Sequence, residues 1–288
     1  YYSNALLLLQ TEGKYKSTLV SKSINLAATA GLDGTLMIEL EAINLWVARV
    51  LYHVAAIRKV DGNFDDCVSC YKEALRLRRR CKSADKYGLF DAQANLSFAQ
   101  VLQDHGHYDK SIESYSQSLR AYVAHFGKDC IHVAEILSGL GKSFAMKLVF
   151  NKTIQCYNKA MRVYENCDGA ALKEKKGLLH REIAVTLQRL DGVHVFDVLG
   201  HYRSCVVFLE EFSERQVEQE STHGLNKQLL HCYSEMLVVL RQVLRVERDL
   251  NIKGELYEEI EDVLHRMGNL HASFAQYDEA LNCFIEVL

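Results

Sequence analysis

The sequence predicts an all-α protein, built as a solenoid of antiparallel helical hairpins. One observation behind this prediction is a recurring frame: a glycine, an aromatic residue two positions later, and then small and aromatic residues at fixed offsets. Successive frames start at residues 62, 106 and 148, which are 44 and 42 positions apart. Self-similar helical units with a period of about 20–50 residues indicate stacked repeats, because one unit cannot bury its apolar faces alone. The other observation is that none of the 288 residues is proline, the residue that interrupts helices.

Four copies of the frame are clear. The first two have their glycine, here called the anchor, at Gly62 and Gly106; the third has Leu148 in its place, and the last surrounds Tyr277. Apolar residues on either side of the anchor step by three or four positions, which lines up one face of a helix. Glycine between two such helices tolerates backbone angles that other residues avoid. The frame therefore predicts helical hairpins over residues 46–82, 90–125, 133–166 and 258–288.

The remaining segments fit the frame less well. Residues 1–30 are expected to form a degenerate first unit, and the chain is expected to be a fragment because it starts without methionine and stops within a repeat. A second degenerate unit is expected over 175–220, with an inserted loop at 191–199 because the next glycine-aromatic turn comes about nine residues late. Residues 225–250 have a helical pattern and form either one long helix or a degenerate hairpin. We expect all units to belong to one domain, 1–288.

Composition and charge argue against several classes of protein. With 34 basic and 37 acidic residues the net charge is −3, whereas general nucleic-acid binders carry a strong basic excess. No apolar run approaches the roughly 18 residues that a membrane span needs, so membrane insertion is not predicted. The nine cysteines have irregular spacing, which favours reduced thiols and a cytoplasmic location.

Two short motifs suggest chemistry that the frame does not support. Residues 139–143 end like a phosphate-binding loop, but Ile136 stands where that loop requires glycine, and Gly141 falls in the small-residue slot of a helix. Cys67 and Cys70 have the spacing of a metal or redox pair, but a zinc site needs about four ligands. We interpret both motifs as packing positions. No catalytic residues, cofactor, metal or small-molecule substrate are predicted, so the protein is not expected to be an enzyme.

The basic run Arg76–Lys82 ends the second helix of its unit. Positive side chains at that end of a helix complement the helix dipole. The alternative is a patch that binds an acidic ligand or directs nuclear import. The sequence leaves both interpretations open.

The small residues seven positions before each anchor, together with the aromatic residues two and nine positions after it, resemble the tetratricopeptide repeat. These small residues are Ala55, Ala99, Gly141 and Gly268. A period of 42–44 rather than about 34 residues is similar to the longer-repeat branch that includes kinesin light chains. The resemblance implies a right-handed superhelical solenoid that serves as a scaffold for protein–protein interactions.

The resemblance also implies that the first helix of each hairpin lines an inner, concave wall where a partner lies. Positions 13, 10, 6 and 3 before each anchor face this wall, and the fifth unit is registered on Ala184. The mixture of apolar, amide and cationic side chains suits an extended peptide or an amphipathic helix, and a mild basic bias suggests an acidic one. The predicted partner-binding residues are Arg49, Tyr52, Lys59, Gln93, Leu96, Gln100, Gln103, Glu135, Ser138, Lys142, Arg181, Val185 and Gln188.

Two other functions stay open at this point. An RNA-binding helical solenoid is one alternative, although the sequence pI of about 6.5 weighs against it. The other is a regulatory domain of a larger enzyme whose catalytic part lies outside these residues.

Overall fold

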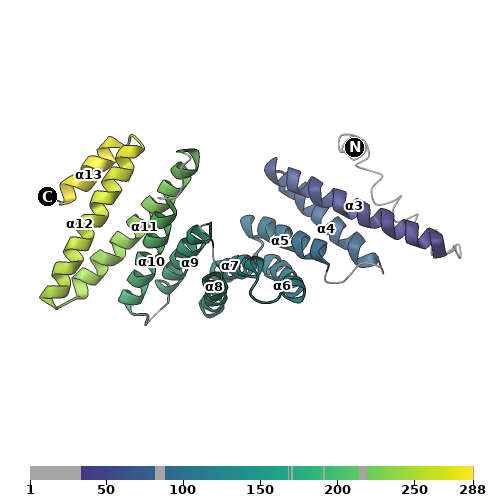
Figure 1. Ribbon diagram of the computed structural model, residues 1–288, viewed down its shortest axis with the longest axis horizontal. Coiled ribbons are helices and arrows are strands. Elements are labelled where there is room, and N and C mark those ends of the chain that lie inside the picture. The colour runs from purple at the N-terminus through teal and green to yellow at the C-terminus, as the bar shows by residue number, and fades with distance from the viewer. Residues whose placement is uncertain are drawn as a thin grey trace. The chain divides into compact units, whose positions relative to one another are not determined.

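The computed structural model describes residues 34–81, 88–167, 169, 171–190, 192–213 and 219–287. The degenerate unit predicted at residues 1–30 lies outside the described residues. The described chain contains helices and no strand, and successive helices run back and forth in pairs (Figure 1). The helices are α3 (Gly34–Val60), α4 (Phe64–Arg80), α5 (Leu89–Asp104), α6 (Tyr108–Phe126), α7 (Ile131–Met146), α8 (Phe150–Glu165), α9 (Ala171–Leu187), α10 (Val195–Ser213), α11 (Gln219–Val246), α12 (Leu250–Ser273) and α13 (Tyr277–Val287).

These helices belong to two compact units, the first ending at Gly127 and the second beginning at Lys128. In the first unit α3 packs on α4 and α5 on α6; in the second α7 packs on α8, α9 on α10 and α12 on α13. The predicted all-α stack of antiparallel helical hairpins is therefore confirmed. That residues 1–288 form a single domain stays a prediction.

The anchor of the frame is the turn between the two helices of a hairpin. Gly62 and Gly106 have φ of 72° and 77°, and Leu148 and Ala275 occupy the same place with φ of 59° and 58°. In the first turn the amide of Asn63 donates to the carbonyl of Arg58 at 3.0 Å and that of Gly62 to Lys59 at 3.2 Å. This pair of bonds satisfies carbonyls at the helix end and requires the left-handed conformation at the anchor, which glycine adopts without strain.

The small slots of the frame let the two helices of a hairpin approach closely. A Cβ atom added at Gly141 would lie 2.5 Å from Tyr157, and one at Gly268 would lie 2.5 Å from Phe284. At the slot after the turn, Ser111 Oγ donates to the carbonyl of Ala99 at 2.8 Å. These contacts confirm that Gly141, in the middle of α7, is a packing residue.

Cys67 fills the equivalent slot of the first hairpin. Its side chain is fully buried, and its thiol donates to the carbonyl of Ala55 at 3.2 Å. Burial raises the pKa of this thiol, so it stays protonated and acts as a small packing group. The packing interpretation of Cys67 is confirmed.

The loop predicted at 191–199 is wrong over most of its length. Helix α10 begins at Val195, and Leu199 is fully buried within it, while residue 191 lies outside the described residues. The residue with positive φ is Gly192 (80°), not Gly200. The small residue Ala184 and the buried aromatic residue Tyr202 are 18 positions apart. The equivalent residues of the first hairpin, Ala55 and Tyr71, are 16 positions apart, so the insertion in this unit is two residues and not nine.

The open alternative for residues 225–250 is resolved as a single long helix. Helix α11 continues from Gln219 to Val246 without a turn, and α12 starts at Leu250 behind the capping side chain of Asp249. Helix α11 packs against both α10 and α12. It therefore adds one unpaired helix between the hairpin α9–α10 and the hairpin α12–α13.

Candidate functional site: the odd-numbered helices

Within each of the two units, successive odd-numbered helices contact each other through polar side chains. In the first unit, Lys59 of α3 pairs with Asp104 of α5 at 3.6 Å, and the hydroxyl groups of Tyr52 and Ser97 lie 3.2 Å apart. These residues belong to the first helices of their hairpins, where the predicted partner-binding residues lie. Part of the predicted binding wall therefore holds neighbouring repeats together.

The same pattern continues in the second unit. Glu135 of α7 forms an ion pair with Lys175 of α9. Burial alone would raise the pKa of Glu135, but hydrogen bonds from Lys175 and His132 outweigh it and hold this pKa below its usual value. The predicted site residue Glu135 is therefore a charged bridge between two repeats, largely neutralised by Lys175.

Arg181 forms the most complete of these bridges. Its guanidinium donates two hydrogen bonds of 2.7 Å to the carboxylate of Glu235 on α11 and lies 2.6 Å from Nε2 of His231. The two side chains of the ion pair are only 20% and 23% exposed. Burial would lower the pKa of Arg181, but the paired Glu235 carboxylate raises it instead. A bidentate, half-buried pair of this kind is stronger than an exposed one.

The contacts between odd-numbered helices continue to α13 at the end of the second unit. In this last hairpin, however, the odd-numbered helix is the second helix and not the first. Arg241 of α11 pairs with Glu286 of α13, and Arg203 of α10 donates to Glu259 of α12 at 2.7 and 2.6 Å. Helix α12 therefore continues the even-numbered helices although it is the first helix of its hairpin. The extra helix α11 causes this shift. The expectation that every first helix lines the same wall is wrong for the last hairpin.

Two of the glutamines predicted to bind a partner accept hydrogen bonds from the hydroxyl groups of buried tyrosines. Gln103 Oε1 accepts a hydrogen bond from Tyr115 at 3.2 Å, and Gln188 Oε1 accepts one from Tyr202 at 3.2 Å. Each tyrosine is the aromatic residue of its frame and is almost completely buried. Without an acceptor its hydroxyl group would be buried unpaired, which costs about 1–3 kcal/mol.

The other predicted residues leave an open surface. Arg49, Gln93, Gln100 and Lys142 are exposed, and within the described part of the chain they form no ion pair or side-chain hydrogen bond. Three further predicted residues are half-buried: Leu96, Ser138 and Val185. On α5 the side chains of residues 93, 96 and 100 share one helix face, since they are three and four positions apart. This α5 stripe combines one apolar side chain with two free amides.

Two of the five basic residues in the run Arg76–Lys82 form ion pairs within the first unit. Arg76 pairs with Glu73, and Arg78 donates to both oxygens of Asp91 at 2.9 and 3.1 Å. Arg79 is the member of the run that lines a cleft of about 420 Å³, which lies between α4, α5 and α6. Lys82 lies outside the described residues.

The sequence did not point to Lys175, Glu235 and His231, which bridge to the predicted residues Glu135 and Arg181. They lie 40, 54 and 50 positions from the side chains that they contact. Charge complementarity at one repeat length is the signal that could have found Lys175. Among the residues that the structure describes, no group of three potential ligands could hold a metal ion, and no helix has the length and apolar character to cross a membrane.

Hairpins with a small-residue slot, an aromatic plug and a left-handed turn define a helical-repeat protein. Residues 46–122 match the family model of the tetratricopeptide repeat, so the predicted resemblance to this repeat is confirmed. None of the curated proteins compared with the chain matches it in sequence.

Three solved structures resemble this chain at low sequence identity. BtubC (BKLC) from P. vanneervenii is 16% identical, with a TM-score of 0.49 over 94% of this chain and 86% of that one. A putative kinesin light chain from Podosopora anserina with nearly identical TPR-like repeats is 10% identical, with a TM-score of 0.46 over 83% and 92%. A Rap protein complexed with Competence and Sporulation Factor is 14% identical, with a TM-score of 0.48 over 88% and 78%.

Proposed function

We propose that this protein is a scaffold for protein–protein interactions that holds a peptide or helical segment of a partner against its odd-numbered helices. The observation that carries the proposal is the α5 stripe of Gln93, Leu96 and Gln100, whose two amides have no partner within the described residues. Residues seven positions apart on a helix lie about 10 Å apart, which is close to three residues of an extended chain. The amides can therefore bind the main chain of a partner while Leu96 contacts a side chain.

Charge favours an acidic partner segment. Lys59 and Arg181 are already paired with carboxylates of this chain. In contrast, Arg49 on α3 and Lys142 on α7 are exposed and have no acidic partner among the described residues. Exposed cations steer an acidic ligand and contribute mainly to its rate of association. The net charge of −3 lacks the basic excess that is typical of RNA binders, so a protein partner is favoured over RNA.

The proposal assigns the protein no catalytic step, cofactor or small-molecule substrate, and places its action in the cytoplasm. In the first unit, binding is expected to come from the exposed side chains of α3 and α5, and in the second unit from those of α7. The inter-repeat ion pairs are expected to stabilise the stack rather than to contact the partner.

Peptides selected from a random library with the purified protein would test this function, with affinity measured by fluorescence anisotropy. Arg49→Glu and Lys142→Glu, alone and combined, should weaken acidic peptides by roughly tenfold or more, as should Gln93→Ala combined with Gln100→Ala. Lys110→Glu, which reverses an exposed charge on α6, is the matched control and should bind as the unmodified protein does.

Native affinity of all selected peptides for all these variants would rule out the proposed surface. A salt-sensitive gel shift with RNA, abolished by the same charge reversals, would instead favour the RNA-binding alternative.

A further inference from the structure

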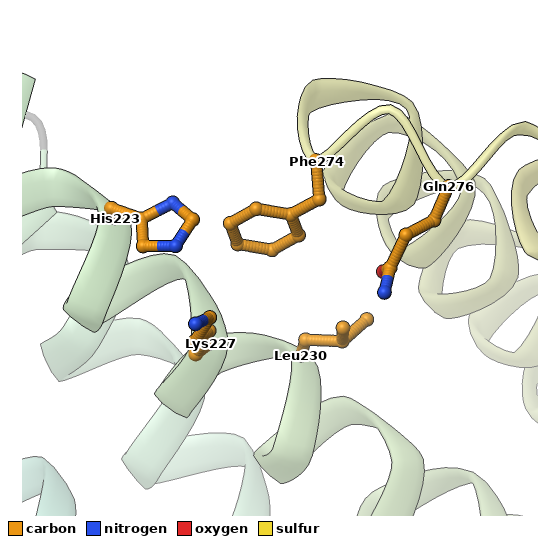
Figure 2. A pocket seen from close by; sticks show the side chains of 5 residues that line it. All are labelled: His223, Lys227, Leu230, Phe274 and Gln276. Carbon is orange, nitrogen blue, oxygen red and sulfur yellow. The ribbon is translucent and has the colours of Figure 1, made fainter.

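A cleft of about 280 Å³ lies between α11 and the turn that joins α12 to α13. Its walls are His223, Lys227 and Leu230 of α11 and Phe274 and Gln276 of the turn (Figure 2). None of these residues belongs to the α5 stripe or to the inter-repeat ion pairs.

The two walls of this cleft come from the irregular part of the repeat pattern. His223, Lys227 and Leu230 are four and three positions apart, so they share one face of α11. Ala275 has a φ of 58°, and the amide of Gln276 donates to the carbonyl of His271 at 2.9 Å. Both features fix the turn that presents the side chains on either side of Ala275. The cleft therefore exists because the unpaired helix α11 lies beside the last hairpin turn.

The floor of the cleft is apolar and its edge is aromatic. The rings of His223 and Phe274 meet edge to face, with centroids 4.9 Å apart and an angle of 88° between their planes. Leu230 and Phe274 are half-buried, and Figure 2 shows the Phe274 ring between the imidazole of His223 and the side chains of Leu230 and Gln276. An apolar side chain that entered the cleft would cover these surfaces and gain the free energy of burial.

Two polar side chains of the cleft, Lys227 and Gln276, offer hydrogen-bond donors. Lys227 is exposed and has no acidic partner within the described residues. Gln276 Oε1 accepts a hydrogen bond from His271 Nδ1 at 2.9 Å, so the acceptor of this amide is occupied and its NH₂ group remains. An ammonium group and an amide NH₂ group beside an apolar floor complement a carboxylate next to an apolar side chain.

We propose that this cleft binds a peptide segment in which an apolar side chain lies next to a carboxylate. Its volume is below the roughly 300–1,000 Å³ typical of sites for whole small molecules, which favours one anchoring side chain of a larger ligand. The carboxylate is either the C-terminus of the peptide or an adjacent Asp or Glu side chain, because Lys227 and Gln276 are equally suited to both. The cleft is a second contact on the scaffold proposed above, and its occupation does not require the α5 stripe.

Three labelled peptides test the ligand chemistry on the full chain by fluorescence anisotropy. The first ends in phenylalanine with a free carboxylate, the second is the same peptide with a C-terminal amide, and the third is amidated but has an internal Glu-Phe pair. The first, the third or both should bind at least tenfold more tightly than the second. Which of them binds identifies the source of the carboxylate. Equal affinities for all three peptides would overturn the proposal.

Variants test the position of this site. Lys227→Met keeps the length of an exposed side chain but removes its charge, and should weaken the carboxylate peptides at least tenfold. Phe274→Ala should weaken all binding, with its folding checked by thermal unfolding. Lys159→Met, at an exposed lysine on α8, is the matched control and should leave affinity unchanged. Unchanged affinity in Lys227→Met would overturn the assignment even if Phe274→Ala fails to fold.

The two binding proposals can fail independently. Gln93→Ala combined with Gln100→Ala should leave the three short peptides unaffected, since they occupy only the cleft. If that double variant abolishes their binding while Lys227→Met does not, the cleft is excluded and the α5 surface is retained. If library peptides bind normally to the double variant but not to Lys227→Met, the α5 surface fails and the cleft stands.

Discussion

Replacing Gly141 with alanine tests whether close packing of α7 against α8 limits the stability of the third hairpin. Gly141 lies in the middle of α7, and an added Cβ atom would be 2.5 Å from Cε1 and 2.6 Å from Cδ1 of Tyr157. Real Cβ atoms do not approach other atoms so closely, so either the ring or the helix must move. Tyr157 is only 1% exposed, which prevents the ring from turning into solvent.

The magnitude follows from two opposing effects. Overpacking a core costs about 1–3 kcal/mol. Alanine in place of glycine within a helix raises the free energy of unfolding by roughly 0.5–1 kcal/mol, because alanine loses less conformational entropy on folding. The free energy of unfolding should therefore fall by about 0–2.5 kcal/mol in Gly141→Ala.

Gly200→Ala is the matched control, because Gly200 lies within α10 of the same unit and an added Cβ atom there would have no neighbour within 4 Å. The free energy of unfolding of Gly200→Ala should rise by roughly 0.5–1 kcal/mol. The two variants should therefore differ in this free energy by the cost of overpacking, about 1–3 kcal/mol. Urea unfolding followed by circular dichroism measures both midpoints and slopes. Equal stabilities of the two variants would refute the close contact between Gly141 and Tyr157.

Three further predictions concern the turns, the bridges and the histidines. Leu148→Gly should raise the free energy of unfolding by up to about 1 kcal/mol, because glycine relieves the left-handed strain at φ 59°; a loss of stability in urea unfolding would contradict this. A double-mutant cycle of Arg181→Met and Glu235→Gln should give a coupling of about 1–2 kcal/mol, and a coupling near zero would show that the bridge is not stabilising. Burial lowers the pKa of His180, whose Nδ1 lies 2.9 Å from Nδ1 of His201, to about 4. The unfolded chain binds this proton near pH 6.5, so stability should fall as the pH drops from about 6.5 towards 4, and His180→Gln should flatten that part of the urea-midpoint profile.

The helices and turns could be predicted from the sequence because local chemistry decides them. The turn at Gly106 requires a left-handed residue between two helical patterns, and glycine reveals it directly. The hairpin at Leu148 was also found, since its small and aromatic slots compensate for the missing glycine. The turn at Gly192 was missed because Gly200 followed by an aromatic residue imitates the anchor, although Gly200 lies inside α10.

Whether the predicted residues bind a partner stays a prediction, but the structure shows which of them are already engaged by other side chains. The offsets select one face of each first helix, but they cannot show which side chains meet a charge from the next repeat. Lys59 and Arg181 satisfy the offsets and are engaged by Asp104 and Glu235. Arg49 satisfies them equally and is exposed. The difference depends on residues tens of positions away.

By itself the sequence determined the class of fold, the position of most turns and the packing role of Gly141 and Cys67. These features depend on backbone angles and on small residues within one hairpin, which a repeating pattern records. Only the tertiary structure decided which polar residues bridge repeats, how α11 shifts the phase of the last hairpin, and that a donor-lined cleft lies beside Phe274. Those features arise where one hairpin meets the next, and the residues that meet there are set by packing between elements that no local pattern aligns.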